Sequence, residues 1–458
     1  MFAIEHFHHL AYMAVGVAML GIGASGALVA GLGAPRPPRA EAWLTRAALL
    51  TAASLVASPA LVHLVPLDAT RLAWDVATWP RLALMNALLA VPFASGALVT
   101  VLALTLEPER TGRLYGASFA GAGLGALLAV AILWVASPAR ALAMPAVVAA
   151  VGAMAAAGGR QEAGGASGAP LISRLPPPAS RVLPWLALAG ALLALVHPPW
   201  RLTITPYKGL PQVSAYPDAR TVGERSSPVG WTAAVDAAAF RFAPGLSLGY
   251  RGLFPRQTAL FVDGELAGAA TWWGETPGAA RMLDWLPTAL PYATGPARRV
   301  LVIGAGGGLE VAGALAHGAD HVTAVELSPD VVHFAGTAPS TAAPAGTVRW
   351  VVGDARSFVA RSRDRFDLIV IGPGGAPGTA AAGVHALDQD FLHTVDAYAA
   401  YLDRLDGDGV LAVTRWLTVP PRAPVRVTLT AAEALRRGRT DALDDGRGLV
   451  VARSWGTA

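Results

Sequence analysis

The first 200 residues hold runs of apolar side chains long enough to cross a lipid bilayer, and no other feature restricts the possible folds as strongly. A transmembrane helix needs about 20 consecutive, predominantly apolar residues. Five runs approach or exceed this length with their flanks, and a sixth is shorter and begins close to a proline: 10–32, 47–65, 82–106, 114–136, 141–154 and 182–196. The sequence therefore predicts an α-helical transmembrane bundle whose partner is the lipid bilayer.

The arginines between these runs predict how the helices are oriented. The loops after the first, third and fifth runs carry eight arginines, whereas the loops after the second and fourth carry three. Cytoplasmic loops carry the excess of basic residues, so the first group is expected in the cytoplasm. Six full spans would leave residues 201–458 outside the cell, whereas five spans and one interfacial helix keep them inside. The short sixth run favours the second arrangement, with a cytoplasmic soluble domain.

The composition of the chain restricts which cofactors and partners it can bind. The chain has no cysteine, which excludes disulfides, thiolate nucleophiles and cysteine metal sites. Its formal excess of +4 comes from arginines spread along the chain, without the aromatic-interleaved basic stripe that nucleic-acid binding needs. The segment EHFHHL groups Glu5 with three histidines, which are possible metal ligands. A polar helix end at the membrane interface explains this segment better, so we expect neither a metal nor a nucleic-acid partner.

The second half of the chain has a different pattern, which suggests four parts. Residues 1–157 are predicted to form the transmembrane domain, and 158–200 a linker rich in glycine, serine and proline with the short apolar run. In 201–295, short alternating runs flank Asp263-Gly264, a strong hairpin signal, and predict an antiparallel β subdomain. In 296–458, strands alternate with helices, which predicts a Rossmann-like α/β domain with a parallel sheet.

One turn in this last part is suited to binding a nucleotide or nucleoside. The strand VLVIG leads into Gly304, Gly306 and Gly308, which permit a tight turn and let a ligand approach the backbone at a helix N-terminus. A dinucleotide fingerprint would have glycine at position 309, where this chain has Leu309. The G-x-G-x-G spacing is instead typical of S-adenosylmethionine-dependent transferases, and it favours a methionine-derived nucleoside over NAD.

Acidic residues follow the next two strands. Glu326 ends the second strand, 22 residues after Gly304, where a carboxylate can accept both ribose hydroxyls. Asp354 and Ala355 come at the end of the third strand, where the aspartate can accept the adenine amino group. Because the carboxyl ends of parallel strands meet at one edge of a sheet, the three strand ends together predict an adenosine pocket.

The order of these motifs resembles that of a known family. RRVLVIGAGGGLEV, VTAVELSPDVV, VVGDARSFV and FDLIVIG, preceded by the DGE hairpin, are similar to the spermidine synthases (polyamine aminopropyltransferases) over roughly residues 205–420. The apolar first half is closer to the membrane-embedded bacterial members, which implies a multi-pass protein of the bacterial inner membrane. The resemblance also implies a Rossmann-like transferase core, S-adenosylmethionine or its decarboxylated form as co-substrate, a polyamine acceptor and a homodimer.

Two aspartates of that family are missing from this chain. Where the family's glycine turn has an aspartate that holds the aminopropyl group, this chain has Gly307; where the fourth strand leads into the catalytic aspartate, it has Gly372. Other side chains near the expected site are candidates to replace them. These are Asp388 and Asp390 for catalysis, and Asp284, Tyr292 and His385 for substrate contacts.

Two other functions remain open at this point. The missing aspartates are compatible with methyl transfer from S-adenosylmethionine to a small or lipid-soluble acceptor. They are also compatible with a catalytically silent domain that binds a nucleoside and regulates the membrane domain. Fold-level analogy alone does not choose among these functions.

Overall fold

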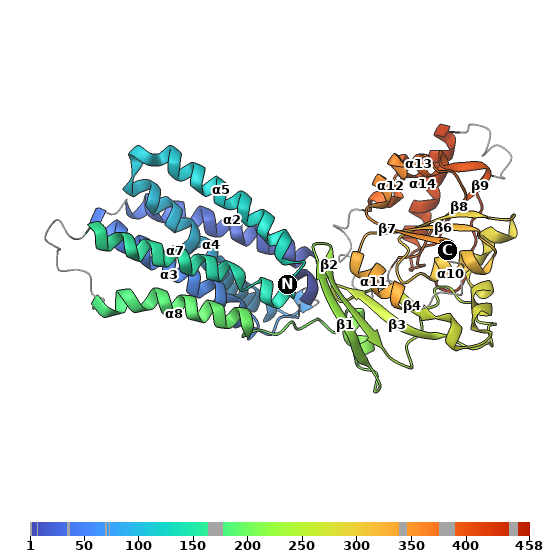
Figure 1. The fold of residues 1–458 in the computed structure, drawn as a ribbon, viewed down its shortest axis with the longest axis horizontal. Helices are drawn as coiled ribbons and strands as arrows, with labels where there is room; N and C mark the ends of the chain where they lie inside the picture. Colours follow the sequence, from blue (N-terminus) through green and yellow to red (C-terminus); the bar gives the residue numbers. More distant parts are fainter. Residues whose placement is uncertain are drawn as a thin grey trace. The chain divides into compact units, whose positions relative to one another are not determined.

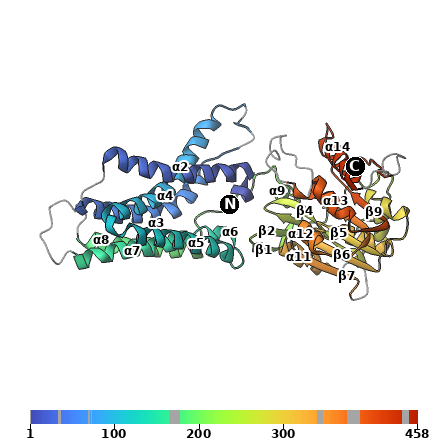
Figure 2. The same ribbon diagram turned by 90° about the horizontal axis from the view of Figure 1, so that it is seen from above.

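The computed structural model describes residues 2–6, 8–33, 37–68, 71–72, 74–163, 177–338, 346–374, 390–438 and 448–458. The chain divides into two compact units, Met1–Thr205 and Pro206–Ala458. The first is made of helices and the second contains both β-sheets (Figures 1 and 2). We refer to them as the helical unit and the α/β unit.

The helical unit is built from long apolar helices, as the sequence predicts. Its helices are α1 (Phe2–Glu5), α2 (His8–Leu32), α3 (Pro37–Val62), α4 (Thr78–Leu106), α5 (Thr111–Ile132), α6 (Pro138–Ala141), α7 (Met144–Ala163) and α8 (Pro177–Val196). Helix α4 packs against both α2 and α3, and α7 packs against α3 and α8. At Gly21 the backbones of α2 and α4 approach so closely that an added Cβ would lie 2.9 Å from the Ala90 carbonyl oxygen.

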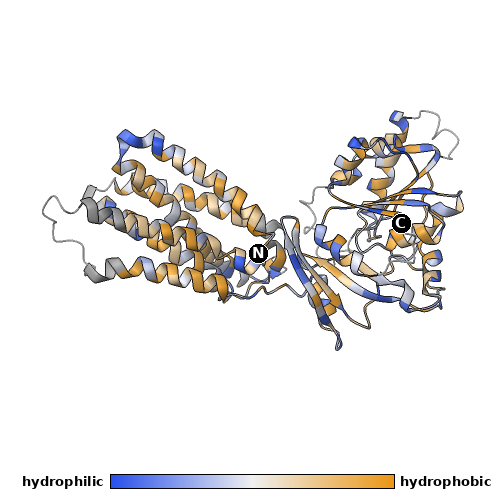
Figure 3. Ribbon diagram, in the orientation of Figure 1, coloured by the Kyte–Doolittle hydropathy of each residue, from blue (hydrophilic) through white to orange (hydrophobic). Residues whose placement is uncertain are grey.

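Five segments of this unit are helical, long and apolar enough to cross a membrane, judged by length and composition alone. They are Tyr12–Leu32, Ala40–Val62, Thr78–Leu106, Pro108–Ile132 and Pro138–Ala157. Figure 3 shows the hydrophobic colouring along these helices. The sixth run, Val182–Val196, is also helical but shorter. The expected helices are therefore present, while their orientation in a membrane stays a prediction.

The acidic residue near the amino terminus has a partner that the sequence did not indicate. The buried Glu5 carboxylate lies 2.7 Å from His63 Nε2 and accepts a hydrogen bond of 3.0 Å from the backbone N–H of Thr203. Glu5 thus ties the end of α3 to the segment that follows α8. Among the described residues, no group of three or more His, Cys, Asp or Glu side chains is placed to hold a metal ion.

The α/β unit begins with the short helix α9 (Gly209–Ser214), which is followed by a small antiparallel sheet, as predicted. Its strands pair in chain order and are β1 (Arg220–Ser227), β2 (Gly230–Asp236), β3 (Arg256–Val262) and β4 (Glu265–Trp272). Asp263 (φ 50°) and Gly264 (φ 82°) join β3 to β4 with the left-handed backbone of a two-residue hairpin. Opposite Leu260 and Phe261, strand β4 has Ala267 as an extra residue, which makes a β-bulge.

The second sheet is parallel and has the order β7-β6-β5-β8-β9. Its strands are β5 (Arg299–Ile303), β6 (His321–Glu326), β7 (Val348–Val352), β8 (Phe366–Ile371) and β9 (Leu405–Val413). The helices of this part are α10 (Leu309–Ala316), α11 (Pro329–Thr337), α12 (Ala355–Arg361), α13 (Val395–Leu402) and α14 (Arg422–Gly438). One apolar core joins α12, α13 and α14 to the sheet, and a second joins α10 to the opposite face. This is the predicted Rossmann-like arrangement, and its strand order reverses at β5.

An ion pair fastens α11 to the small sheet. Arg225 on β1 donates to Asp330 on α11 at 2.9 Å, and the Asp330 side chain is only 2% exposed. The other Asp330 carboxylate oxygen, Oδ2, has no hydrogen-bond partner among the described residues. Val331 and Phe334 pack against strands of the small sheet beside this pair. Arg225 therefore supplies the charge that balances the buried Asp330 carboxylate.

We expect Arg225→Ala to lower the free energy of unfolding of the α/β unit by about 2 kcal/mol, because it leaves the buried Asp330 carboxylate unpaired. Arg298→Ala is the control, since Arg298 and Asp320 lie 3.9 Å apart with side chains 74% and 59% exposed. That control should cost no more than about 0.5 kcal/mol. Denaturant unfolding of the detergent-solubilised protein measures both. Equal effects would contradict a structural role for the buried pair.

Candidate functional site

The glycine turn lies at the point where the strand order of the parallel sheet reverses. It connects β5 to α10, and Gly304, Gly306 and Gly308 have φ values of 66°, 51° and 90°. Residues that have a side chain rarely adopt this left-handed backbone conformation, so glycine is required at these three positions. The Gly304 N–H donates to the Val325 carbonyl oxygen at 2.9 Å, which joins the turn to the end of β6. Ligands of open α/β sheets bind beyond the carboxyl ends of the strands at such a switch point.

Glu326 connects the turn to the start of α11. One carboxylate oxygen accepts the Gly306 N–H at 2.9 Å, and the other accepts the Ser328 N–H at 3.0 Å. A carboxylate has about four lone-pair sites, so these two bonds leave acceptor capacity on both oxygens. Ser328 itself caps α11 by accepting a hydrogen bond from the Val331 N–H. Glu326 is therefore held in place at the strand end and still has room for two further donors.

Asp354 lies at the end of the neighbouring strand. Glu326 pairs with Val352 in the register of β6 and β7, and the Gly353 N–H donates to the Glu326 carbonyl oxygen at 2.9 Å. Asp354 caps α12 by accepting the Ser357 N–H at 2.8 Å. The hydroxyl and the backbone N–H of Ser357 hold the pKa of Asp354 below its usual value. Asp354 thus serves as a helix cap, and its contact with adenine stays a prediction, as does that of Ala355 beside it.

Apolar side chains stand exposed beside these carboxylates. Leu327 directly follows Glu326 and is 54% exposed, and Val352 ends β7 and is 51% exposed. A free apolar surface next to ordered acceptors is the usual composition of a small-molecule site. The strand ends therefore offer both a polar and an apolar surface to a nucleoside.

Strand β4 lies directly against the glycine turn, and this contact explains the absence of an aspartate at position 307. An added Cβ on Gly307 would lie 2.0 Å from the Ala269 carbonyl oxygen. An added Cβ on Gly306 would lie 2.9 Å from the Ala267 carbonyl oxygen, and one on Gly268 would lie 2.9 Å from the Gly307 nitrogen. The bulge at Ala267 thus brings β4 so close that no side chain fits at position 307.

The second missing aspartate has a different explanation, which involves Glu310. Gly372 follows β8 and is buried. An added Cβ at Gly372 would lie 3.0 Å from one carboxylate oxygen of Glu310 and 3.1 Å from its carboxyl carbon. Glu310 belongs to the first turn of α10 and is 8% exposed. A carboxyl group is therefore present beside Gly372, and it comes from the helix after the glycine turn.

Burial raises the pKa of the Glu310 carboxyl to about 7, and its own backbone N–H opposes this shift. Sequence reasoning missed this residue because Glu310 and Gly372 are brought together only by the pairing of β5 with β8. The available signal was a single glutamate in the otherwise apolar helix LEVAGALA. A charged residue in such a helix is rarely buried without a reason.

Two of the predicted substrate residues, Asp284 and Tyr292, contact His317 at the C-terminal end of α10. Asp284 is 65% exposed and contacts His317 Nε2 at 3.3 Å, at the C-terminal end of α10. The ring of Tyr292 stacks on that of His317 with centroids 4.3 Å apart. Positions 310 and 317 lie two turns apart on one helix face. Burial, followed by the charge of Glu310, raises the pKa of Tyr292 above its usual value. Both substrate roles stay predictions.

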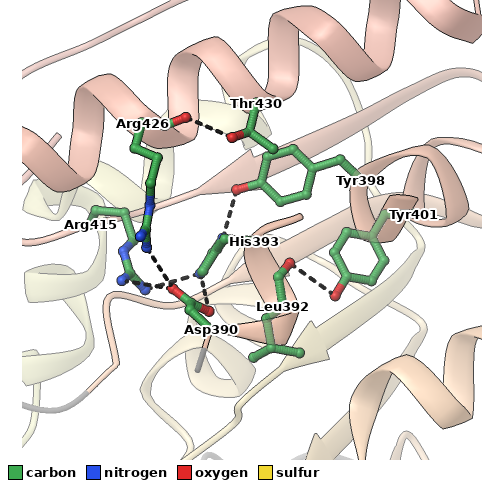
Figure 4. Close-up of polar contacts among 8 residues, drawn as sticks. All are labelled: Asp390, Leu392, His393, Tyr398, Tyr401, Arg415, Arg426 and Thr430. Atoms are coloured by element: carbon green, nitrogen blue, oxygen red, sulfur yellow. Dashed lines mark hydrogen bonds and ion pairs between the residues drawn. The ribbon is translucent and has the colours of Figure 1, made fainter. Parts of the chain in front are cut away.

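Asp390, one of the two predicted catalytic residues, is held by two arginines (Figure 4). Its Oδ2 lies 3.4 Å from Arg415 and 3.3 Å from Arg426. Arg415 also donates to His393 Nε2 at 3.0 Å, so the neutral ring carries its proton on Nδ1 and donates to the Tyr398 hydroxyl at 2.7 Å. Burial, followed by the charge of Arg415, lowers the pKa of His393. Asp390 is thus part of a paired network.

The other predicted catalytic residue, Asp388, and the substrate candidate His385 lie outside the described residues. Among the candidate acids that the structure describes, Glu326 and Asp354 accept backbone N–H groups. Asp284 pairs with His317, and Asp390 pairs with Arg415 and Arg426. Glu310 is buried, and no basic side chain of the described residues forms an ion pair with it.

No protein-family model and no curated protein matches this chain. Solved structures similar to it include a spermidine synthase in complex with the transition-state analogue AdoDATO, at 16% identity and a TM-score of 0.31, covering 47% of this chain and 63% of that chain. The spermidine synthase from Thermotoga maritima matches at 15% identity and a TM-score of 0.32, covering 47% and 64%. A SAM-dependent methyltransferase from Agrobacterium tumefaciens matches at 20% identity and a TM-score of 0.27, covering 46% and 72%.

The chain thus spans less than two thirds of the length of these two spermidine synthases. At TM-scores well below 0.5, these similarities carry no argument about function. The functional assignment rests on the residues of this chain.

Proposed function

We propose that the α/β unit is a transferase that binds a sulfonium nucleoside, S-adenosylmethionine or its decarboxylated form, and moves an alkyl group from the sulfur to a small-molecule amine. The helical unit anchors this transferase in the membrane. One contact carries the proposal: the Gly306 N–H donates to Glu326 at 2.9 Å. It joins a left-handed glycine turn to an acidic strand end at the switch point of a parallel sheet.

The strand ends supply a contact for each part of an adenosine. The free lone pairs of Glu326 suit the two ribose hydroxyls. Leu327 and Val352 offer exposed apolar surface for the purine face. Asp354 is ionised at neutral pH, because Ser357 stabilises its carboxylate, and suits the adenine amino group. The N-terminus of α10 and the glycine turn then lie beside the sulfonium end of the ligand.

Alkyl transfer from a sulfonium needs little chemistry from the protein. The sulfur leaves as a neutral thioether, so no acid is needed to protonate it. The reaction does need a neutral amine whose lone pair points at the carbon beside the sulfur. The order of the motifs resembles that of the aminopropyltransferases, so we expect the aminopropyl group of decarboxylated S-adenosylmethionine to be the one transferred, with a diamine or polyamine as acceptor.

Product analysis tests this proposal. The purified full-length protein is incubated with 1,4-diaminobutane and either decarboxylated S-adenosylmethionine or S-adenosylmethionine. We expect methylthioadenosine and an aminopropylated amine with the first donor. S-Adenosylhomocysteine from the second donor would instead identify a methyltransferase. If neither donor gives its product, the proposed transferase activity is wrong, and nucleoside binding without turnover becomes the explanation of the site.

A further inference from the structure

We infer that Glu310 is the catalytic base of this transferase and takes the proton from the acceptor amine beside Gly372. This inference rests on the proposed function and deepens it. The spermidine synthases, which this chain resembles, carry an aspartate where this chain has Gly372. Glu310 would supply the same functional group from another element of the fold.

The position of the carboxyl is the first argument. It lies 3.0–3.1 Å from the place where the Cβ of a side chain at position 372 would begin. Ile303 and Ile371 are register partners in the parallel pair β5 and β8, so the residues that follow them, Gly304 and Gly372, lie side by side. The Glu310 carboxyl therefore lies between the glycine turn and the carboxyl end of β8. The acceptor must approach the sulfonium carbon at this place.

The lack of a charged partner is the second argument. Asp284 contacts His317, and Asp390 contacts Arg415 and Arg426. Among the described residues, no basic side chain forms an ion pair with Glu310. A buried carboxyl that serves only the fold is normally paired, because desolvating an unpaired charge is unfavourable. Glu310 is 8% exposed, so it is buried but retains a small accessible surface.

Burial, and not a charge on a neighbouring element, is the main cause of the raised pKa of Glu310. The ionisable residues on the elements that pack against α10 are Arg281 and Asp284 on the 3₁₀ segment Ala279–Trp285, Tyr292 on Pro287–Ala293, Glu265 on β4, Arg299 on β5, and His321 and Glu326 on β6. Burial is the main cause that holds the pKa of Glu310 near 7. A base with a pKa near the working pH is the most effective one.

Proton transfer to Glu310 precedes the alkyl transfer. The acceptor binds as an ammonium ion and gives one proton to the Glu310 carboxylate, which becomes a neutral carboxylic acid. The free nitrogen lone pair attacks the methylene carbon beside the sulfonium and forms a C–N bond. The C–S bond breaks and its electron pair stays on sulfur, which becomes a neutral thioether. The product leaves as a secondary ammonium ion, and Glu310 returns its proton to water.

The test compares kcat, nucleoside affinity and pH dependence in Glu310→Gln and wild type, with decarboxylated S-adenosylmethionine and saturating 1,4-diaminobutane. Glutamine keeps the shape but does not take up a proton at this pH. We expect kcat to fall by about 100-fold to 10,000-fold, whereas the Kd of methylthioadenosine changes by less than about threefold, within the usual tolerance of a residue outside the binding contacts. In wild type, kcat should rise with pH through about 7 and then level off. This rise should be absent in Glu310→Gln.

Moving the carboxyl is the second arm of the test. Glu310→Ala removes it, and the double variant Glu310→Ala/Gly372→Asp replaces it from β8. We expect the double variant to recover at least about tenfold in kcat over Glu310→Ala, because the carboxyl returns to the same volume. Glu433→Gln, a surface change on α14, serves as the control and should leave kcat unchanged.

The outcomes separate this inference from the proposed function. If wild type forms product and Glu310→Gln retains its kcat and its pH profile, Glu310 is not the base, although the transferase function stands. If Glu310→Gln loses nucleoside affinity in proportion to kcat, the residue acts in folding or binding, and the inference is also wrong. If wild type forms no product from either donor, both the proposed function and the inference fail.

Discussion

Gly307→Asp is expected to destabilise the α/β unit by more than about 3 kcal/mol and to abolish nucleoside binding, because the new side chain overpacks against backbone. The variant introduces the aspartate that the resemblance in motif order leads us to expect at this position. A Cβ there would nevertheless lie 2.0 Å from the Ala269 carbonyl oxygen and 2.7 Å from the Ala269 nitrogen. Strand β4 would have to move away from the glycine turn, and the turn would lose its support. Calorimetric titration with methylthioadenosine and denaturant unfolding measure the two effects.

Gly313→Ala provides the matched control for this variant. Gly313 lies inside α10, six residues further along, and nothing is within 4 Å of an added Cβ. Alanine is the better helix former, so this variant should gain about 0.5–1 kcal/mol. If Gly307→Asp folds with wild-type stability and binds the nucleoside, the close approach of β4 to the turn does not exist in the protein in solution.

Glu326→Ala is expected to weaken nucleoside binding by about 100-fold or more, since hydrogen bonds to a charged acceptor contribute about 1.5–3 kcal/mol each. The variant removes the acceptor for both ribose hydroxyls. It also leaves the Gly306 and Ser328 N–H groups without their present partner, which loosens the turn. The expected loss is in Kd, so titration of the full-length protein with methylthioadenosine measures it directly.

Glu433→Ala is the control for a lost surface carboxylate. Glu433 pairs with Arg436 and Arg437 on the exposed side of α14. Its replacement should leave the Kd of the nucleoside unchanged. An affinity of Glu326→Ala within threefold of wild type would mean that the ribose is not held at the end of β6.

The fold of the α/β unit was largely predictable because local signals and tertiary pairing agree. Asp263-Gly264 forms the expected hairpin, since both residues adopt a left-handed backbone that few others tolerate. Ser328, followed by Pro329, caps α11, and this pair of residues is typical of a helix start. The central parallel strands β5 and β8 are mostly apolar and buried, which is the pattern that burial on both faces of a sheet produces. The glycine turn was also predictable, because its three glycines lie within five consecutive residues.

The details of the site depended on contacts between distant segments. Glu310 and Gly372 are 62 positions apart, and only the pairing of β5 with β8 brings them together. The steric requirement for Gly307 comes from the bulge at Ala267 in β4, forty positions earlier in the chain. The sequence indicated Asp390 as a candidate acid, but its ion pairs with Arg415 and Arg426 depend on the packing of the segments that carry these arginines. No periodicity or spacing in a single sequence encodes such proximities.

The proposed transferase function requires an adenosine bound at the ends of β5, β6 and β7. Calorimetric titration of the wild-type full-length protein with 5′-methylthioadenosine, the nucleoside core common to both donors, tests this claim most directly. We predict one saturable site with a Kd of about 1–100 µM, as expected for a product nucleoside held by a few hydrogen bonds and apolar contacts. Absence of any saturable heat or displacement at millimolar ligand would contradict the account at its centre.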